Sequence, residues 1–269
     1  TTLFRSIHER VERTLQAETV TRDFDVKNIH AVKISGDMRL TIKQGETASM
    51  RLVGLREGID NIQVTSEDNL LTIGERTISE RVCFFCIHRP IEGEVILPRL
   101  ESIEASQVSR IIFDGFTNDL SLKSTNASMI QGTLLGQHVT TTVQNVGRVE
   151  LSGNVNSLSL ILQDAARVTA DQIQANKVQV NQSDVSRVSL LGTATQLTAE
   201  LKDASRLEAY DFVVDKGAIV TRDVSRAEVR AHESLAATST QNSRIYYEDT
   251  GASTTIRVLR ASEIRFQPE

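Results

Sequence analysis

Residues 164–188, DAARVTADQIQANKVQVNQSDVSRV, contain the same five-residue cell at both ends. Each copy, at 164–168 and at 184–188, consists of an aspartate, two small or aliphatic residues, an arginine and a valine. Between the copies apolar and polar residues alternate, which is the pattern of a β-strand with one buried face. The cell therefore marks a turn between strands, and its recurrence indicates that the turn is repeated.

The cell recurs along most of the chain. Its fourth residue, an arginine in most copies, occupies positions 110, 129, 148, 167, 187, 206, 226, 244 and 263, so the spacing between copies hardly varies. A period of about 20 residues is typical of solenoids. Leucine-rich repeats have a similar length, but the leucine and asparagine positions that they need are missing. Such a repeat holds three short strands and three bends, so the sequence predicts an all-β fold, a parallel β-helix with about 19 residues per coil.

The cell also predicts two columns of side chains along one corner of the coils. Asn and Asp tolerate the left-handed conformation that a sharp bend needs. The two residues after them are expected to be small because the backbone of neighbouring coils crowds there. We expect a first column of Asn126, Asn145, Asp164, Asp184, Asp203, Asp223 and Asn242. The arginine then points outward, which predicts a second column of Arg148, Arg167, Arg187, Arg206, Arg226 and Arg244.

The composition excludes several classes of protein. The chain of 269 residues has a net charge of -5, so no overall positive field favours nucleic acid. No run of about 18 apolar residues is present, which excludes a transmembrane helix. Only 4% of the residues are aromatic and none is Trp, which suits a slim core and gives few surfaces for sugar or base stacking.

The segments outside the repeats differ from them in the pattern of apolar and polar residues. In residues 1–17 an apolar stripe of Leu3, Ile7, Val11 and Leu15 predicts a short amphipathic helix, which either caps the core or docks a partner. Residues 18–98 show short alternating strands and form the N-terminal β part of the β-helix. Residues 99–269 hold the regular repeats, so 18–269 is predicted to be one continuous domain.

The two cysteines, Cys83 and Cys86, lie close together and are followed by His88. A thioredoxin-like redox pair, half of a zinc site and a haem attachment site are the functional interpretations of this spacing. Ile87 separates Cys86 from the histidine, which disfavours haem, and a zinc site needs two more ligands. A local disulfide, or a pair of buried thiols, is favoured. The chain begins with Thr1, so we expect that any signal peptide has already been removed.

Several short motifs resemble a known family. They are residues 40–46 (LTIKQGE), 69–73 (NLLTI) and 97–103 (LPRLESI), together with the repeated Ala-Ser or Val-Ser corners. With these motifs the chain resembles the auto-transporter adhesin head (GIN) domain family over about residues 23–266. This chain has Asn or Asp where the family usually has Gly, and both can adopt the left-handed conformation. The resemblance implies a right-handed β-helix exported to the bacterial envelope or surface, and it brings no catalytic residues.

The two columns admit three interpretations. The aspartates could bind Ca²⁺ or act as paired acids and bases, as in β-helical polysaccharide-cleaving enzymes. The arginines could bind a polyanion. Alternatively the columns neutralise one another or are simply solvated corners. The third interpretation is favoured because a regular repeat contains no unique site, and because only Tyr210, Tyr246 and Tyr247 offer aromatic stacking surfaces.

We therefore predict a non-enzymatic scaffold with no catalytic residue, metal or cofactor. It is expected to be exported, either to the periplasm, to the outer membrane or to the cell surface. Its expected partners are envelope proteins or polysaccharide, and not nucleic acid. One alternative is an accessory subunit of a large envelope complex, such as the outer-membrane part of a secretion system. The other is an enzyme that acts on polysaccharides.

Overall fold

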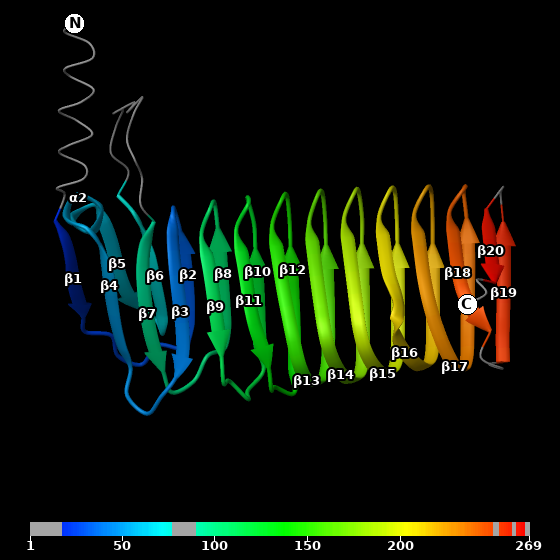
Figure 1. Cartoon of the computed structure of the whole chain (residues 1–269), viewed down its shortest axis with the longest axis horizontal. Coiled ribbons are helices and arrows are strands. Elements are labelled where there is room, and N and C mark those ends of the chain that lie inside the picture. Colours follow the sequence, from blue (N-terminus) through cyan, green and yellow to red (C-terminus); the bar gives the residue numbers. More distant parts are fainter. Residues whose placement is uncertain (1–17, 77–89, 250–252, 260–261, 267–269) are drawn as a thin grey trace, which may run out of the picture.

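The computed structural model describes residues 18–76, 90–249, 253–259 and 262–266. The chain winds into a rod in which each coil stacks on the one before it (Figure 1). The described strands are β1 (Thr19–Phe24), β2 (Ala31–Ser35), β3 (Met38–Gln44), β4 (Ser49–Leu55), β5 (Ile62–Glu67), β6 (Leu70–Glu75), β7 (Ile91–Leu97), β8 (Ser102–Ser106), β9 (Arg110–Asp114), β10 (Leu120–Ser124), β11 (Met129–Leu134), β12 (His138–Val143), β13 (Arg148–Leu162), β14 (Arg167–Gln182), β15 (Arg187–Leu201), β16 (Arg206–Thr221), β17 (Arg226–Thr240), β18 (Arg244–Asp249), β19 (Ser253–Leu259) and β20 (Glu263–Phe266), and the described helix is α2 (Arg56–Asp60).

Each regular coil contributes to two sheets that face one another. The first sheet runs through β3, β9 and β11, the first halves of β13 to β17, and then β18 and β20. The second sheet runs through β2, β8, β10 and β12, the second halves of β13 to β17, and β19. All these pairings are parallel, and they confirm a solenoid of about 19 residues per coil. The expected right-handed sense of the coil stays a prediction.

The expectation of three short strands per coil is wrong in detail. From β13 to β17 one long strand passes through the bend between the two sheets, and only the opposite corner is a turn. In β13 the register shifts between Ser152 and Gly153, so the bend is a local irregularity inside a strand. The coil is therefore flattened, with two long sides.

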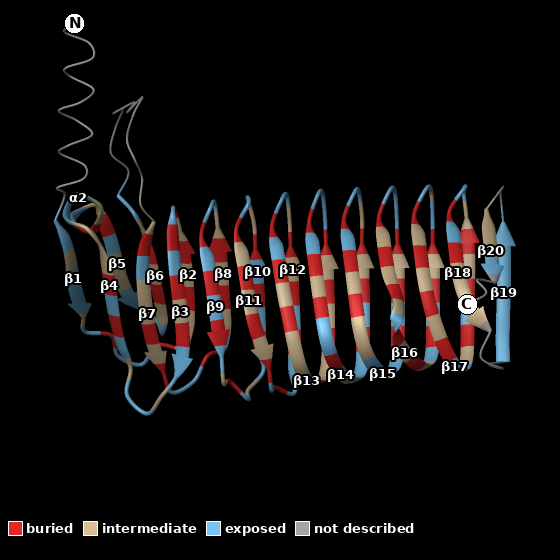
Figure 2. Ribbon diagram, in the orientation of Figure 1, coloured by how far each residue is buried: buried red, intermediate tan, exposed pale blue. Residues whose placement is uncertain are grey.

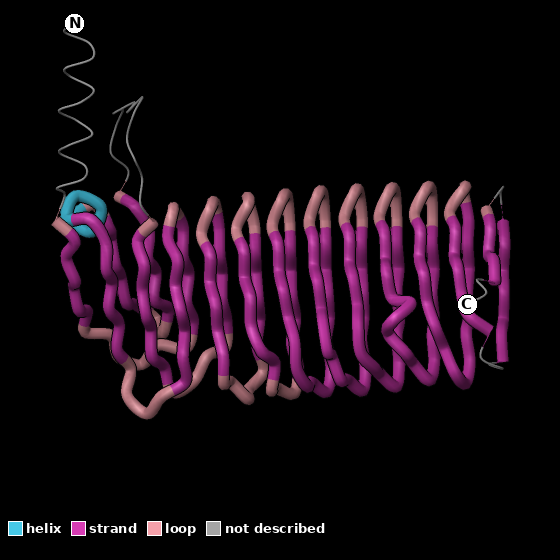
Figure 3. The backbone as a smooth tube through the Cα atoms, viewed as in Figure 1, coloured by secondary structure: helices cyan, strands magenta, loops and turns pink. Residues whose placement is uncertain are grey.

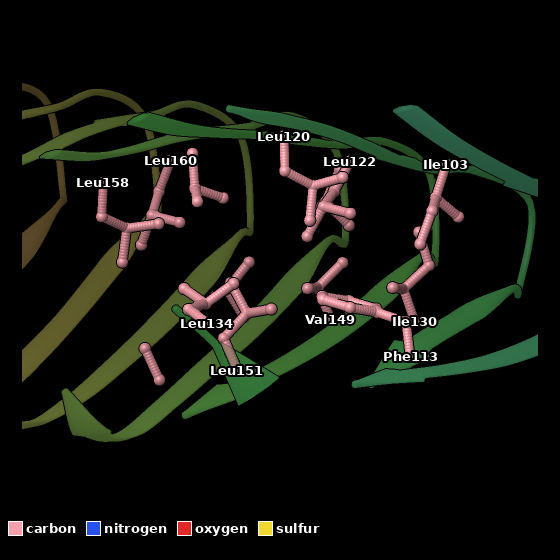
Figure 4. Packing of buried hydrophobic residues seen from close by; sticks show 14 of the residues in the cluster. Ile103, Phe113, Leu120, Leu122, Ile130, Leu134, Val149, Leu151, Leu158 and Leu160 are labelled. Atoms are coloured by element: carbon pink, nitrogen blue, oxygen red, sulfur yellow. The ribbon is translucent and has the colours of Figure 1, made fainter. Parts of the chain in front are cut away.

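The core is one layer of mostly aliphatic side chains that enter the space between the sheets from both sides. In β13 the inward residues Val149 and Leu151 enter the core from the first sheet, and Leu158 and Leu160 enter it from the second. Figure 2 shows this alternation of buried and exposed positions along the strands. Figure 4 shows side chains from successive coils filling the space, among them Phe113 beside Ile130. The narrow gap between the sheets accounts for the low aromatic content.

The N-terminal end of the rod departs from the parallel pattern. There β4 pairs antiparallel with both β1 and β7, and β5 pairs antiparallel with β6. The short helix α2 follows β4, and its Ile59 is fully buried. Antiparallel strands and a helix thus close this end. The predicted helix at residues 1–17 lies outside the described residues.

Small residues allow the bend to be tight. In the register of the first sheet, Leu134, Gly153, Ile173, Gly192 and Phe212 stack on one another, so that large residues alternate with glycine. Gly153 and Gly192 have φ of 106° and 128°, which only glycine adopts without strain. The alternation leaves room for Ile173 and Phe212, which are fully buried.

One charged cluster ties three successive coils together on the second sheet. The carboxylate of Glu104 lies 3.1 Å from Nζ of Lys123 and 3.3 Å from Nζ of Lys33. Partial burial alone would raise the pKa of Glu104, but the hydrogen bonds and charges of Lys123 and Lys33 outweigh it and hold the pKa below its ordinary value. The ionised form of Glu104 is therefore favoured in the folded state.

Glu104→Gln is expected to lower the free energy of unfolding by less than about 1 kcal/mol at pH 7. The folded state depresses this pKa, so the stabilisation is present at neutral pH and is lost as the pH falls through the folded-state value. Urea unfolding at a series of pH values should show the midpoints of variant and wild type converging in acid. Glu150→Gln is the control, because Glu150 forms no ion pair with a described residue. A gap between midpoints that persists in acid would contradict the prediction.

Candidate functional site at the coil corners

The repeated cell forms the tight turn that leads from the second sheet to the first. Figure 3 shows these turns as loops in a row along one edge of the rod, whereas the bends of β13 to β17 on the opposite edge are continuous strand. Each turn presents four successive positions of the cell. Their side chains form parallel columns because the coils stack in register.

The first position holds the predicted Asx column. Asn126, Asn145 and the four aspartates from Asp164 to Asp223 all have φ between 53° and 61°. The carboxylates link neighbouring coils, because the backbone N–H of Asp164 donates to Oδ2 of Asp184 at 3.2 Å and that of Asp184 to Oδ2 of Asp203 at 3.3 Å. These contacts give the column a structural role.

Asn242 does not lie in this column. The register pairs Arg226 with Arg244, so Gln241 stacks on Asp223 and Asn242 falls one position later. Both Gln241 and Asn242 have positive φ. The first position of this copy is therefore held by Gln241, with a φ of 58°, and the prediction of Asn242 for the column is wrong.

The third position of the cell is buried. Ser109, Ser128, Ser186, Ser205, Ser225 and Ser243 are at most 1% exposed. In the last of these, Oγ of Ser243 donates to the carbonyl of Thr221 in the preceding coil at 3.0 Å and accepts from the N–H of Thr240 at 3.0 Å. Crowding explains the small residues here, as expected.

The second position is not crowded, and here the expectation is wrong. Its side chains point to solvent, and Val108, Val146, Val185 and Val224 are 57–64% exposed. In register with them are exposed alanines, so valine and alanine alternate coil by coil. We call this row the corner ridge: Val108, Ala127, Val146, Ala165, Val185, Ala204 and Val224. The strict alternation is visible in the sequence, but the prediction did not use it.

The fourth position holds the arginine column. Arg148, Arg167, Arg187, Arg206, Arg226 and Arg244 are paired in register from strand to strand. The column continues beyond the predicted six, because Arg110 and Arg39 lie in the same register, and Met129 interrupts it. Arg39 was missed because the repeat cell is absent before residue 99.

The arginines pair with glutamates of the first sheet. Arg206 lies 2.9 Å from Glu208 and 3.3 Å from Glu228, and Arg226 lies 2.8 Å from Glu228. Arg187 reaches Glu208 at only 3.8 Å. No described ion pair joins an arginine of the column to an aspartate of the Asx column, so the two columns do not neutralise one another by contact.

Three features of the corner and its surroundings bear on catalysis and sugar binding. No group of three or more His, Cys, Asp or Glu side chains that could hold a metal ion is found among the described residues. A shallow groove beside the corner is lined by Glu200, which forms ion pairs with Lys202 and Arg222. Glycoside hydrolysis needs a second carboxylate nearby. The ring of Tyr246 is covered by the guanidinium of Arg226 at 4.4 Å, so that face is closed to a sugar.

Two other predicted sites lie outside the described residues. They are the stripe of Leu3, Ile7, Val11 and Leu15 and the pair Cys83 and Cys86. The docking helix and the disulfide therefore stay predictions. Within the described ranges no helix has the length and apolar character that would let it cross a membrane.

Solved structures with the same architecture come from species of Parabacteroides. A "putative lipid binding protein" from Parabacteroides distasonis is 12% identical, with a TM-score of 0.70 and coverage of 93% of this chain and 97% of the other. A "putative adhesin" from Parabacteroides merdae is 16% identical, with a TM-score of 0.64 and the same coverage. A "putative adhesin" from Parabacteroides distasonis is 14% identical, with a TM-score of 0.65 and coverage of 93% and 98%. At these identities the likeness concerns the fold alone.

The sequence itself identifies the family. No curated protein matches it significantly. A family model does match, over residues 28–183 and again over 155–251, which together are well over half of the chain. The overlapping matches reflect the internal repeat. The chain belongs to the family described as "Putative auto-transporter adhesin, head GIN domain".

Proposed function

We propose that this protein is a non-catalytic binding scaffold of the bacterial cell envelope or surface. The adhesin description of its family supports export and a binding role. The alternative of an accessory subunit in a secretion system depends on residues 1–17, which lie outside the described residues. The enzyme alternative has no pair of carboxylates to support it in the groove beside the corner.

The observation that carries the proposal is the repetition of outward groups in register. The corner cell recurs from Arg110 to Arg244, interrupted at Met129, and the coils from Arg167 to Arg226 present the same charged groups about 4.8 Å apart. A catalytic site needs one constellation that differs from its surroundings. A row of equivalent groups instead supports many weak contacts at once, which raises the overall affinity.

Two measurements test this proposal together. Fractionation of the native host with an antibody against the chain should place the protein in the envelope fraction. The protein should co-sediment with insoluble cell-wall polysaccharide. It should release no new reducing ends from that polysaccharide. Cleavage that is abolished by one carboxylate substitution, such as Asp184→Asn, would show an enzyme instead. Recovery only in the cytosolic fraction would also overturn the proposal.

A further inference from the structure

The corner edge carries three parallel columns with different chemistry. The corner ridge runs along the middle. On the side of the second sheet lies the acidic column, which we define as Asp164, Asp184, Asp203 and Asp223. On the side of the first sheet lies the arginine column, with Arg167, Arg187, Arg206 and Arg226 in the same four coils. Every one of these coils thus presents an acid, an aliphatic residue and a base in the same order.

The acidic column has no cationic partner within the described chain. None of its four carboxylates forms an ion pair with a described lysine or arginine. Three of them accept hydrogen bonds from the backbone N–H of the preceding coil, at 3.2 to 3.3 Å. Like charges that stack directly in a sheet destabilise it, and the coil rise puts them about 4.8 Å apart. A cationic surface outside the described chain would relieve this repulsion.

The corner ridge is exposed over the same coils. Val185 and Val224 are 64% and 63% exposed, and the alanines between and beside them are exposed as well. Single exposed aliphatic residues are ordinary, but a continuous apolar row with charged borders marks a contact surface. Figure 1 shows the corners aligned along one edge, which makes the ridge accessible to a straight partner.

A second copy of the chain supplies the matching surface. A two-fold axis parallel to the rod, lying along the ridge, brings ridge against ridge. The same rotation exchanges the two sides of the edge, so each acidic column faces the arginine column of the other copy at the same coil. A two-fold axis perpendicular to the rod within the contact would instead place acid against acid. We propose that two copies pair side by side along their corner ridges, with the rods parallel.

Two of the four arginines are available for this pairing, whereas Arg206 and Arg226 already form ion pairs with Glu208 and Glu228. Arg167 forms no ion pair with a described residue, and Arg187 only a long one with Glu208. Opposite them in the pair lie Asp164 and Asp184 of the second copy. Interfaces of this symmetric kind are the commonest in oligomers. The ridge is narrow, so the buried area falls at the low end for specific interfaces, and we expect a dissociation constant on the order of micromolar.

Charge exchange provides the first test. Asp164→Lys with Asp184→Lys makes both borders of the ridge basic in those two coils, and Arg167→Glu with Arg187→Glu makes both borders acidic there. By analytical ultracentrifugation each double variant is expected to dimerise at least tenfold more weakly than wild type, whereas an equimolar mixture of the two should form a heterodimer. Lys177→Glu with Lys216→Glu, on the outer face of the second sheet, is the control and should leave dimerisation unchanged. Thermal unfolding checks that every variant folds.

Cysteine cross-linking tests the orientation. In a Cys83→Ser, Cys86→Ser background, Val108→Cys and Val224→Cys lie at opposite ends of the ridge. In the parallel pair each variant should form a disulfide with itself under oxidation, and a mixture of the two should give few mixed cross-links. Mixed cross-links alone would indicate an antiparallel pair and overturn the proposal. Wild-type protein that stays monomeric far above micromolar concentration would overturn it too. The envelope location and the binding role proposed above are measured separately.

Discussion

Gly192→Ala is expected to lower the free energy of unfolding by about 3–5 kcal/mol, because two penalties combine. Gly192 has a φ of 128°, a conformation that costs a residue with a Cβ of order 1–3 kcal/mol. A Cβ there would also lie 2.7 Å from the backbone nitrogen of Ile173 in the preceding coil, and closer still to its carbonyl oxygen. Backbone cannot move aside without separating two stacked coils, so the clash is not relieved locally.

Urea unfolding followed by circular dichroism measures this loss, with the slope against denaturant as a check that the same structure unfolds. Gly58→Ala is the matched control. Gly58 lies in helix α2, and a Cβ there would be an ordinary 3.5 Å from Ile91. Alanine favours a helix over glycine, so the control should be neutral or slightly stabilising. Equal effects of the two substitutions would contradict the geometry at the bend.

Gly132→Ala should destabilise the rod by about 2–3 kcal/mol for a different reason. Gly132 is paired in register with Phe113, and a Cβ on it would lie 2.5 Å from Cδ1 of that ring and closer still to Cε1. Phe113 is 1% exposed and is one of the largest fully buried side chains. The ring therefore occupies the space that a side chain at position 132 would need, and it has no free volume to enter.

A double-mutant cycle separates this steric conflict from other effects. Phe113→Leu alone leaves a small cavity and should cost about 1–2 kcal/mol. In Phe113→Leu with Gly132→Ala the new methyl group fills part of that cavity, so the double variant should be at least about 1 kcal/mol more stable than the sum of the single losses predicts. If the losses of the two single variants simply add up to the loss of the double variant, contact with the Phe113 ring is not the reason why position 132 requires glycine.

The period and the corner could be predicted from the sequence because both are local. A left-handed Asx residue, a buried small residue and an outward arginine recur within each copy of the cell, and parallel stacking follows from constant spacing. The two-sided shape of the coil could not be predicted in the same way. It depends on whether the bend near Gly153 and Gly192 breaks the strand, and the hydrogen bonds to neighbouring coils keep the strand continuous.

The ion-pair and hydrogen-bond partners of the corner side chains could not be predicted from the sequence pattern. Arg206 pairs with Glu228, which lies in the next coil, so the pair is visible only once the register is known. The sequence left open whether the aspartates neutralise the arginines or are simply solvated, and it did not reveal that their carboxylates accept hydrogen bonds from backbone amides. The antiparallel start was missed because β4 and β5 carry no copy of the cell.

The bend opposite the corners is the place where a coil can gain or lose residues. Coils differ slightly in length. The register shifts lie between residues 152 and 153, 170 and 173, 189 and 192, 209 and 213, and 214 and 216, all at the bend. The corner keeps its count while the bend absorbs insertions and deletions. Foreign peptides spliced into the bend, for example after Tyr210, should therefore be displayed without disturbing the register of the coils on either side.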